Sequence, residues 1–146
     1  MRENNEDACF VIPGNDVYMV ADGVGGNSSG EVASRTAVER IAGFVNENDI
    51  RECTSAESIF GFLGDAVAVA NRDIYDMGRD TARYRGMATT VVIAYLFRGE
   101  AYIANVGDSR AYVYRSGEMS RITKDHTYVN ELIDKGVITE DESESH

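Results

Sequence analysis

Carboxylates stand beside three predicted strands, where a sheet would bring them together although they lie far apart in the chain. Glu6 and Asp7 open the first of these strands, Asp22 closes the second, and Asp108 follows a third. Side chains at neighbouring strand ends can converge on one rim, and converging carboxylates raise one another's pKa values unless a cation joins them. Oxygen-only ligands suit the hard ions Mg²⁺ and Mn²⁺. Gly23 follows Asp22, and because glycine has no Cβ, its backbone carbonyl can approach an ion closely. Taken singly, each acid is more often a solvated charge, so position alone leaves both interpretations open.

The glycine-rich segment 23–30 matches none of the common nucleotide-binding loops. Gly25 and Gly30 have the outer spacing of a P-loop, but Glu31 occupies the lysine position. The segment also lacks the GxGxxG pattern and the alternating acids of an EF-hand. By itself it predicts a flexible connection from a strand to a helix, and Ser28 with Glu31 has the capping-box spacing of a helix start.

The elements that must position these residues are predicted to be two strands, two helices and an antiparallel meander. Both helices have apolar residues at helical spacing, and Thr54 with Glu57 has capping spacing before the second. Segment 89–97 is apolar on both faces, which is typical of a strand inside a sandwich. This order predicts an α+β domain with helices segregated onto the sheet faces. The predicted elements are strands 8–12 and 16–21, a helix near 30–46, a second and longer helix, strands 89–97, 101–106, 110–115 and 119–123, and a short helix near 129–135.

Length and charge exclude several classes of function. The chain has 146 residues, which is the length of one domain, and 14 Lys and Arg against 25 Asp and Glu give a net charge of −11. Such a balance repels phosphate backbones and anionic lipid, so we expect no nucleic-acid and no membrane partner. The longest apolar run, 91–97, is far too short to span a membrane. The polar, acidic start lacks a signal peptide, and two cysteines make no disulfide framework, so a cytoplasmic location is expected.

Four other side chains could take part in chemistry, but each has a simpler expected role. His126 is expected to bond to backbone in a turn rather than act as an acid. Arg110 is expected in a structural ion pair, and Ser109 has no histidine near it in sequence to serve as a base. Cys9 alternates with its strand neighbours and is expected in the core.

Five motifs in order along the chain resemble those of one enzyme family. They are similar to the motifs of the metal-dependent PPM (type 2C) protein serine/threonine phosphatases, and the bacterial branch is the best match. One such motif would be weak support, whereas five in the right order and spacing are specific. The segments that carry the resemblance are Arg2–Asp7, Val20–Gly26 with Gly30–Ser34, Ala88–Val92, Ala104–Tyr112 and Thr123–His126.

The resemblance implies a fold and an activity. The fold would be an antiparallel β-sandwich flanked by helices in four layers (α/β/β/α), here incomplete at the C-terminal end. Residues 1–146 would be a single, truncated catalytic domain, with 127–146 starting its flap segment. The implied activity is hydrolysis of phosphoserine and phosphothreonine in proteins by a metal-activated water, with two Mn²⁺ or Mg²⁺ ions and a third in bacterial members.

Site residues follow from the resemblance position by position. Asp22 would bridge two metal ions, and the Gly23 carbonyl would bind one of them. Glu6 and Asp7 would hold metal-bound waters, with Glu6 also able to reach the metal. Asp108 would help bind the third ion.

Arg2 would clamp the substrate phosphate, which a planar guanidinium fork suits. Arg2 and Asp22 are therefore the expected catalytic residues. Val24 stands where some eukaryotic members place a histidine proposed as general acid, so water or another group would protonate the leaving group. The implied partners are phosphoproteins, a serine/threonine kinase and its substrates.

The family has further metal-binding aspartates downstream of these motifs, in a later Asp-Gly and a later Asp-Asn motif, and this sequence does not contain them. We therefore expect weak metal binding and poor hydrolysis. Unpaired sheet edges would favour self-association. Two alternatives stay open. One is a catalytically silent, phosphatase-derived module that binds a kinase or a phosphoprotein. The other is an acidic metal-binding domain with coincidental motifs, which requires Asp7, Asp22 and Asp108 to lie apart.

Overall fold

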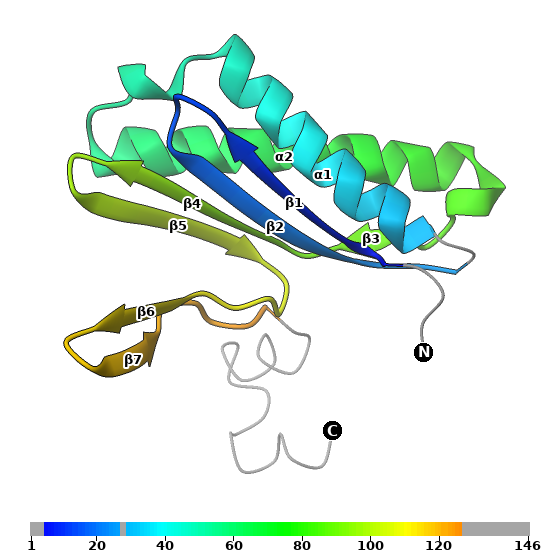
Figure 1. The fold of residues 1–146 in the computed structure, drawn as a ribbon. Coiled ribbons are helices and arrows are strands. Elements are labelled where there is room, and N and C mark those ends of the chain that lie inside the picture. Colours follow the sequence, from blue (N-terminus) through cyan, green and yellow to red (C-terminus); the bar gives the residue numbers. More distant parts are fainter. Residues whose placement is uncertain (1–4, 27–28, 127–146) are drawn as a thin grey trace, which may run out of the picture.

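Two long helices lie side by side across one face of an antiparallel sheet, and a separate hairpin follows the last strand of that sheet (Figure 1). The structure is a computed structural model that describes residues 5–26 and 29–126. Arg2, Ser28 and the segment 127–146, with its predicted short helix and flap, lie outside the described residues. The elements are β1 (Asp7–Ile12), β2 (Val17–Val24), α1 (Ser29–Glu47), η1 (Ile50–Glu52), α2 (Ala56–Asp80), η2 (Ala82–Tyr84), β3 (Ala88–Thr89), β4 (Val91–Phe97), β5 (Glu100–Val106), β6 (Tyr112–Arg115) and β7 (Glu118–Arg121).

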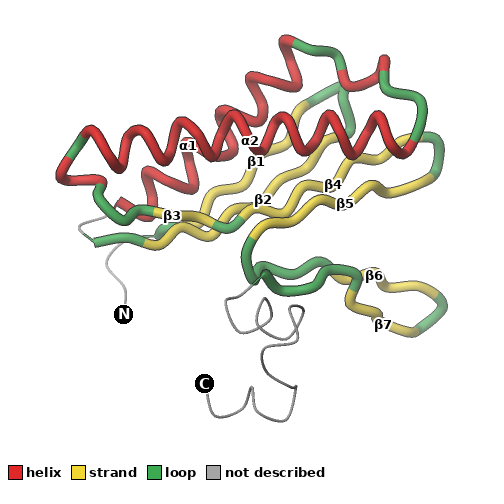
Figure 2. The backbone as a smooth tube through the Cα atoms, turned by 180° about the vertical axis from the view of Figure 1, so that it is seen from behind, coloured by secondary structure: helices red, strands yellow, loops and turns green. Residues whose placement is uncertain are grey.

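The main sheet has the strand order β1-β2-β4-β5, and β3 pairs with the end of β2. Along β2, burial alternates strictly, because side chains of a strand point to opposite faces. Val17, Met19 and Ala21 face the helices and are buried, whereas Asp22 lies on the exposed side. This alternation places the Asp22 side chain on the face opposite the helices. Figure 2 shows both helices lying over one face of the main sheet.

Helix α1 begins and ends close to the predicted limits, because its apolar residues keep the helical period against the sheet. The second helix begins differently from the prediction. Its cap is Ser55, whose hydroxyl accepts from the Ser58 N–H at 3.1 Å, rather than Thr54 with Glu57. Both helices pack on one core, formed by Ile12, Val17, Met19, Ala21, Val38, Ile41, Ala42, Val45, Ile50, Ile59, Leu63, Ala66, Ala70, Val91, Ile93 and Tyr95.

No helix among the described residues is both long and apolar enough to cross a membrane. The cytoplasmic location stays a prediction.

Three strand predictions need correction. Strand β2 does not close at Asp22 but continues to Val24, because Gly23 and Val24 pair with Thr89 and Ala88 of β3. The predicted strand 89–97 is interrupted at Thr90. Strands β6 and β7 pair with each other and form a sheet of their own rather than extending the meander.

The α+β class is confirmed, with helices on one face of the sheet. Within residues 5–26 and 29–126, the opposite face carries exposed apolar side chains such as Val11, Val20 and Leu96. Cys9 shares this face and is exposed, so its predicted place in the core is wrong. Strands β1 and β5 are the two edges of the main path, and self-association through such edges stays a prediction.

Tyr95 brings an unpaired hydroxyl into the core. The residue is 1% exposed, and its hydroxyl has no hydrogen-bond partner in the part of the chain that the structure describes. Burial raises the pKa of Tyr95, because the charged form cannot be solvated there. Its ring stacks on Phe97 at 5.7 Å between centroids, a contact that phenylalanine would keep.

Tyr95→Phe should therefore leave the free energy of unfolding unchanged or raise it by up to about 1 kcal/mol, because an unsatisfied buried group is removed. Urea unfolding of both proteins measures the difference. Tyr102→Phe is the matched control, since its hydroxyl donates to Glu100 at 2.8 Å on the surface. A loss of stability well beyond 1 kcal/mol in Tyr95→Phe would show that this hydroxyl has a partner.

Candidate functional site

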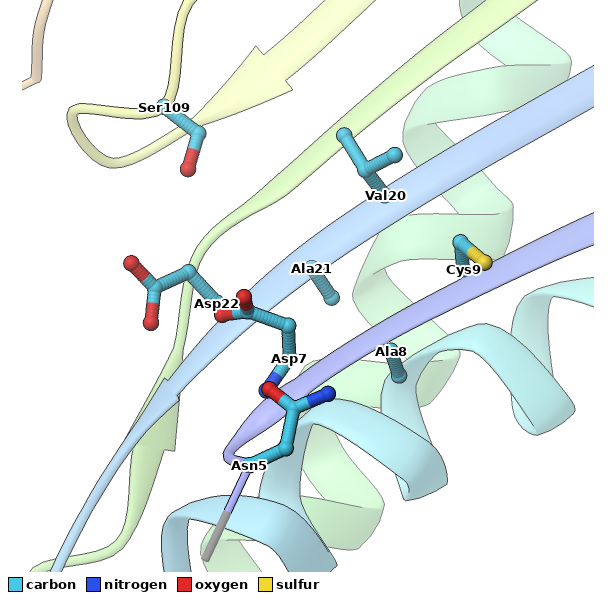
Figure 3. A pocket seen from close by; sticks show the side chains of 8 residues that line it. All are labelled: Asn5, Asp7, Ala8, Cys9, Val20, Ala21, Asp22 and Ser109. Carbon is cyan, nitrogen blue, oxygen red and sulfur yellow. The ribbon is translucent and has the colours of Figure 1, made fainter. Parts of the chain in front are cut away.

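Asp7 and Asp22 face each other across two paired strands. The register of β1 and β2 sets the two residues opposite one another, on the face away from the helices. They line a cavity of about 350 Å³ together with Asn5 and Ser109, as Figure 3 shows. The Asn5 Oδ1 atom accepts from the Asp7 N–H at 3.1 Å and so fixes the entry into β1.

Asp22 also borders a second cavity, of about 450 Å³. The acids that line this cavity with Asp22 are Glu6 and Asp108. Asp22 is thus the residue that both cavities share, with Asp7 on one side and Asp108 on the other. The three aspartates do not lie on unrelated surfaces.

Two glycines allow Glu6 to pack closely against β2 and the start of α1. The Gly23 N–H donates to the Glu6 carbonyl at 3.0 Å. A Cβ on Gly30 would lie 2.5 Å from Glu6 Oε1, and a Cβ on Gly23 would lie 2.9 Å from the Glu6 carbonyl oxygen. Gly23 and Gly30 are therefore glycines because neighbouring atoms leave no room for a Cβ. The sequence alone predicted only a flexible connection here.

The backbone of Asp22 is held by the two threonines that precede β4. The Thr90 N–H donates to the Asp22 carbonyl at 2.9 Å, and the Thr89 hydroxyl donates to the same oxygen at 3.0 Å. In return the Asp22 N–H donates to Thr90 Oγ1 at 3.0 Å. These bonds fix where the Asp22 side chain leaves the sheet.

Asp108 stands in a loop whose first residue, Gly107, is held by two contacts. Gly107 has a φ of +89°, a conformation that favours glycine, and a Cβ there would lie 2.8 Å from Thr90 Cγ2. The Gly107 carbonyl accepts from the His126 N–H at 2.8 Å. His126 is therefore held to this loop through its backbone N–H, and the expected role of its imidazole stays a prediction.

Asp125 ties the segment after β7 to the start of β6. Its carboxylate accepts from Arg110 Nη2 at 2.8 Å and also pairs with Arg121. The expected structural ion pair of Arg110 is thus formed with Asp125. Hydrogen bonds from Arg110 lower the pKa of Asp125, helped by the charges of both arginines and opposed by desolvation.

Asp125→Asn should lower the melting temperature at pH 7. Because the pKa is lowered in the folded protein, the ionised carboxylate stabilises the fold at pH values above its ordinary pKa of 3.8. This contribution is lost as the pH falls through the folded-state pKa. The gap between wild type and variant should therefore shrink as the pH falls below 3.8. Thermal unfolding of both proteins down to about pH 2.5 measures this. Asp65→Asn, which removes an exposed carboxylate on α2, is the control. A gap that stays constant with pH would contradict the ion-pair account.

The donors around the two cavities fit a hard divalent ion. Carboxylate oxygens of Asp7, Asp22 and Asp108 and the carbonyl of Gly23 are oxygen ligands of the kind that Mg²⁺ and Mn²⁺ accept. No three His, Cys, Asp or Glu residues among the described ones form a ready-made metal group. One or two carboxylates with water remain a coordination that Mg²⁺ uses.

Arg2 lies outside the described residues, so its predicted place near the phosphate is not described. Thr90, Ser109 and Gly30 are site-lining or site-packing residues whose structural role the sequence reasoning missed. All three lie inside the motif segments, which was the available signal.

A family model decides what these motifs belong to. The model of protein phosphatase 2C matches residues 2–146 of the chain. The chain belongs to the protein phosphatase 2C family. The interpretation in which the motifs are coincidental is therefore wrong.

Three bacterial phosphatases show how similar this protein phosphatase 2C chain is to known proteins. The serine/threonine phosphatase stp of Listeria innocua is 34% identical over 149 residues, which cover 100% of this chain and 58% of that protein. The solved serine/threonine phosphatase of S. agalactiae aligns with a TM-score of 0.82 at 32% identity, over 100% of this chain and 60% of that one. The catalytic domain of PstP, solved in complex with two manganese ions, aligns with a TM-score of 0.76 at 32% identity, over 98% and 59%. This chain thus spans about three fifths of the length of these three relatives.

Proposed function

We propose that this chain forms part of a protein serine/threonine phosphatase that hydrolyses phosphoserine and phosphothreonine with the help of Mn²⁺ or Mg²⁺. The observation that carries the proposal is the position of Asp22, which faces Asp7 across the strands and borders both cavities. The substrates would be phosphoproteins, including those of a serine/threonine kinase. Residues 1–146 would belong to one catalytic domain.

The proposed roles follow from where each side chain lies. Asp22 would bind ions on both sides, and the Gly23 carbonyl would add a ligand in the second cavity. Glu6 and Asp7 would orient water on either side of Asp22, each from its own cavity. Asp108 would hold a further ion in the second cavity.

Divalent ions bound here would supply a water of lowered pKa and would offset the negative charge of the phosphate. The protein itself would position the carboxylates in advance of ion binding. Asp7 and Asp22 lie opposite each other on paired strands, so a cation bound between them would offset two negative charges. Arg2 would orient the phosphate by a bidentate contact.

The described residues support weak rather than tight binding of ions, because no three potential ligands gather among them. We therefore expect slow hydrolysis of a phosphothreonine peptide by the chain with Mn²⁺, lost on addition of EDTA and in Asp7→Asn. Asp65→Asn, an exposed acid on α2, is the matched control and should keep the rate.

The assay is release of inorganic phosphate, combined with Mn²⁺ calorimetry. Turnover that survives EDTA would overturn the metal-dependent mechanism. Binding of the phosphopeptide without any release of phosphate would instead support the silent binding module.

A further inference from the structure

The hydroxyl of Thr90 joins two segments that carry acids of the site. Thr90 Oγ1 accepts from the Asp22 N–H at 3.0 Å and lies 2.6 Å from Ser109 Oγ. Ser109 is the residue after Asp108, and it is 19 residues from Thr90 in sequence. One hydroxyl pair thus connects the strand of Asp22 with the loop of Asp108.

This arrangement replaces part of the sheet ladder. The pairs Val20–Val92 and Gly23–Thr89 are in one continuous register, which sets Asp22 opposite Thr90. The Thr90 N–H makes the expected bond to the Asp22 carbonyl, but the Asp22 N–H donates to the Thr90 side chain. At the interruption between β3 and β4, the Thr90 hydroxyl thus replaces the Thr90 carbonyl as the acceptor for the Asp22 N–H.

The junction lies between the two cavities. Ser109 lines the cavity that holds Asp7, whereas Asp108 lines the other cavity, and Asp22 borders both. Figure 3 shows the Ser109 side chain extending from its loop toward Asp22. A displacement of Ser109 would therefore move Asp108 relative to Asp22.

We propose that the Thr90–Ser109 hydroxyl pair, here called the hydroxyl latch, fixes Asp108 relative to Asp22. Thr90 and Ser109 are then positioning residues for the metal site. The proposal deepens the proposed function, on which its metal-binding part rests. The Thr90 methyl group reinforces the latch, because Gly107 packs so closely on it that a Cβ would be 2.8 Å away. Neither hydroxyl acts as a nucleophile in this account.

The hydroxyl latch consists of two small, uncharged side chains, so single substitutions can remove one hydroxyl at a time. Ser109→Ala removes one hydroxyl, and Thr90→Val removes the other while keeping the methyl packing. Ser109→Thr keeps a hydroxyl and tests rescue. Ser120→Ala on the exposed strand β7 is the matched control.

In metal-free protein, amide hydrogen exchange of His126 reports on the loop, because this N–H donates to the Gly107 carbonyl. Exchange there should rise roughly threefold to tenfold in Ser109→Ala, which corresponds to one lost hydrogen bond. Thr90→Val should raise exchange at both His126 and Asp22. Unchanged exchange at His126 in both variants would overturn the latch, whether or not the wild type binds Mn²⁺.

Calorimetric titration with Mn²⁺ then tests positioning. Ser109→Ala should weaken binding by about tenfold, as loss of an orienting partner does at metal sites, and Ser109→Thr should restore most of it. In an Asp108→Asn background, Ser109→Ala should have no further effect, because the latch acts through Asp108. An equal effect with and without Asp108 would contradict that route. Absence of Mn²⁺ binding in the wild type would instead count against the proposed function, while the exchange result would still decide the latch.

Discussion

Asp22→Asn is expected to lower the affinity of the chain for Mn²⁺ by more than about a hundredfold, beyond the range that loss of an orienting partner reaches. Asp22 borders both cavities, so its loss should weaken the binding of any ion in either cavity. Asparagine has nearly the same shape, and the side chain is on the exposed face of β2, so the fold should persist.

Thermal unfolding gives a second readout of metal binding. An ion that binds only the folded protein raises its melting temperature. Mn²⁺ should therefore raise the melting temperature of the wild type and should no longer do so in Asp22→Asn.

Calorimetry and thermal unfolding of Asp22→Asn, with Asp65→Asn as control, measure both effects. Retained Mn²⁺ affinity in Asp22→Asn would show that the ion binds elsewhere. A large loss of stability without metal would show that Asp22 serves the fold instead.

Gly23→Ala is the second change with a large expected effect. A Cβ at this position would lie under 3.0 Å from the carbonyl oxygens of both Gly30 and Glu6. Both are backbone atoms, held where β2, β1 and the start of α1 meet, so neither can move without shifting an element. We expect a loss of about 3 kcal/mol or more in the free energy of unfolding, at the upper end of overpacking effects.

Gly43→Ala is the matched control for that change. Gly43 lies within α1, and a Cβ there would meet nothing within 4 Å. The same substitution should stabilise the protein by about 0.5–1 kcal/mol at this position, because alanine is the better helix former. Urea unfolding of both variants should give effects of opposite sign, and a Gly23→Ala protein as stable as wild type would contradict the close packing.

Periodicity predicted those parts of the fold that local patterns determine. The apolar run in 16–21 predicted where β2 begins, and the helical spacing in 30–46 predicted α1 nearly to its observed limits. The end of β2 could not be predicted locally, because Gly23 and Val24 become strand only by pairing with β3, some 65 positions later along the chain. The cap of α2 moved to Ser55 because a neighbouring serine, Ser58, completes its capping box.

The acids of the candidate site were predicted from motif resemblance and from strand ends. Their mutual placement depends on tertiary pairing, which sets Asp7 opposite Asp22. No pattern in the sequence predicts a structural role for Ser109. Its bond to Thr90 spans 19 residues and depends on a loop that Gly107 turns. Such hydroxyl contacts leave no periodic signal in a sequence.

The central claim is that Asp22 and its neighbours bind divalent cations, and paramagnetic broadening by Mn²⁺ tests it most directly. Sub-stoichiometric Mn²⁺ added to ¹⁵N-labelled chain should first broaden the amide signals of Asp7, Asp22, Gly23 and Asp108. In Asp22→Asn this selective loss of signal should disappear. Broadening that begins instead at the acidic run 140–144, and that Asp22→Asn leaves unchanged, would contradict the assignment of this rim as a metal site.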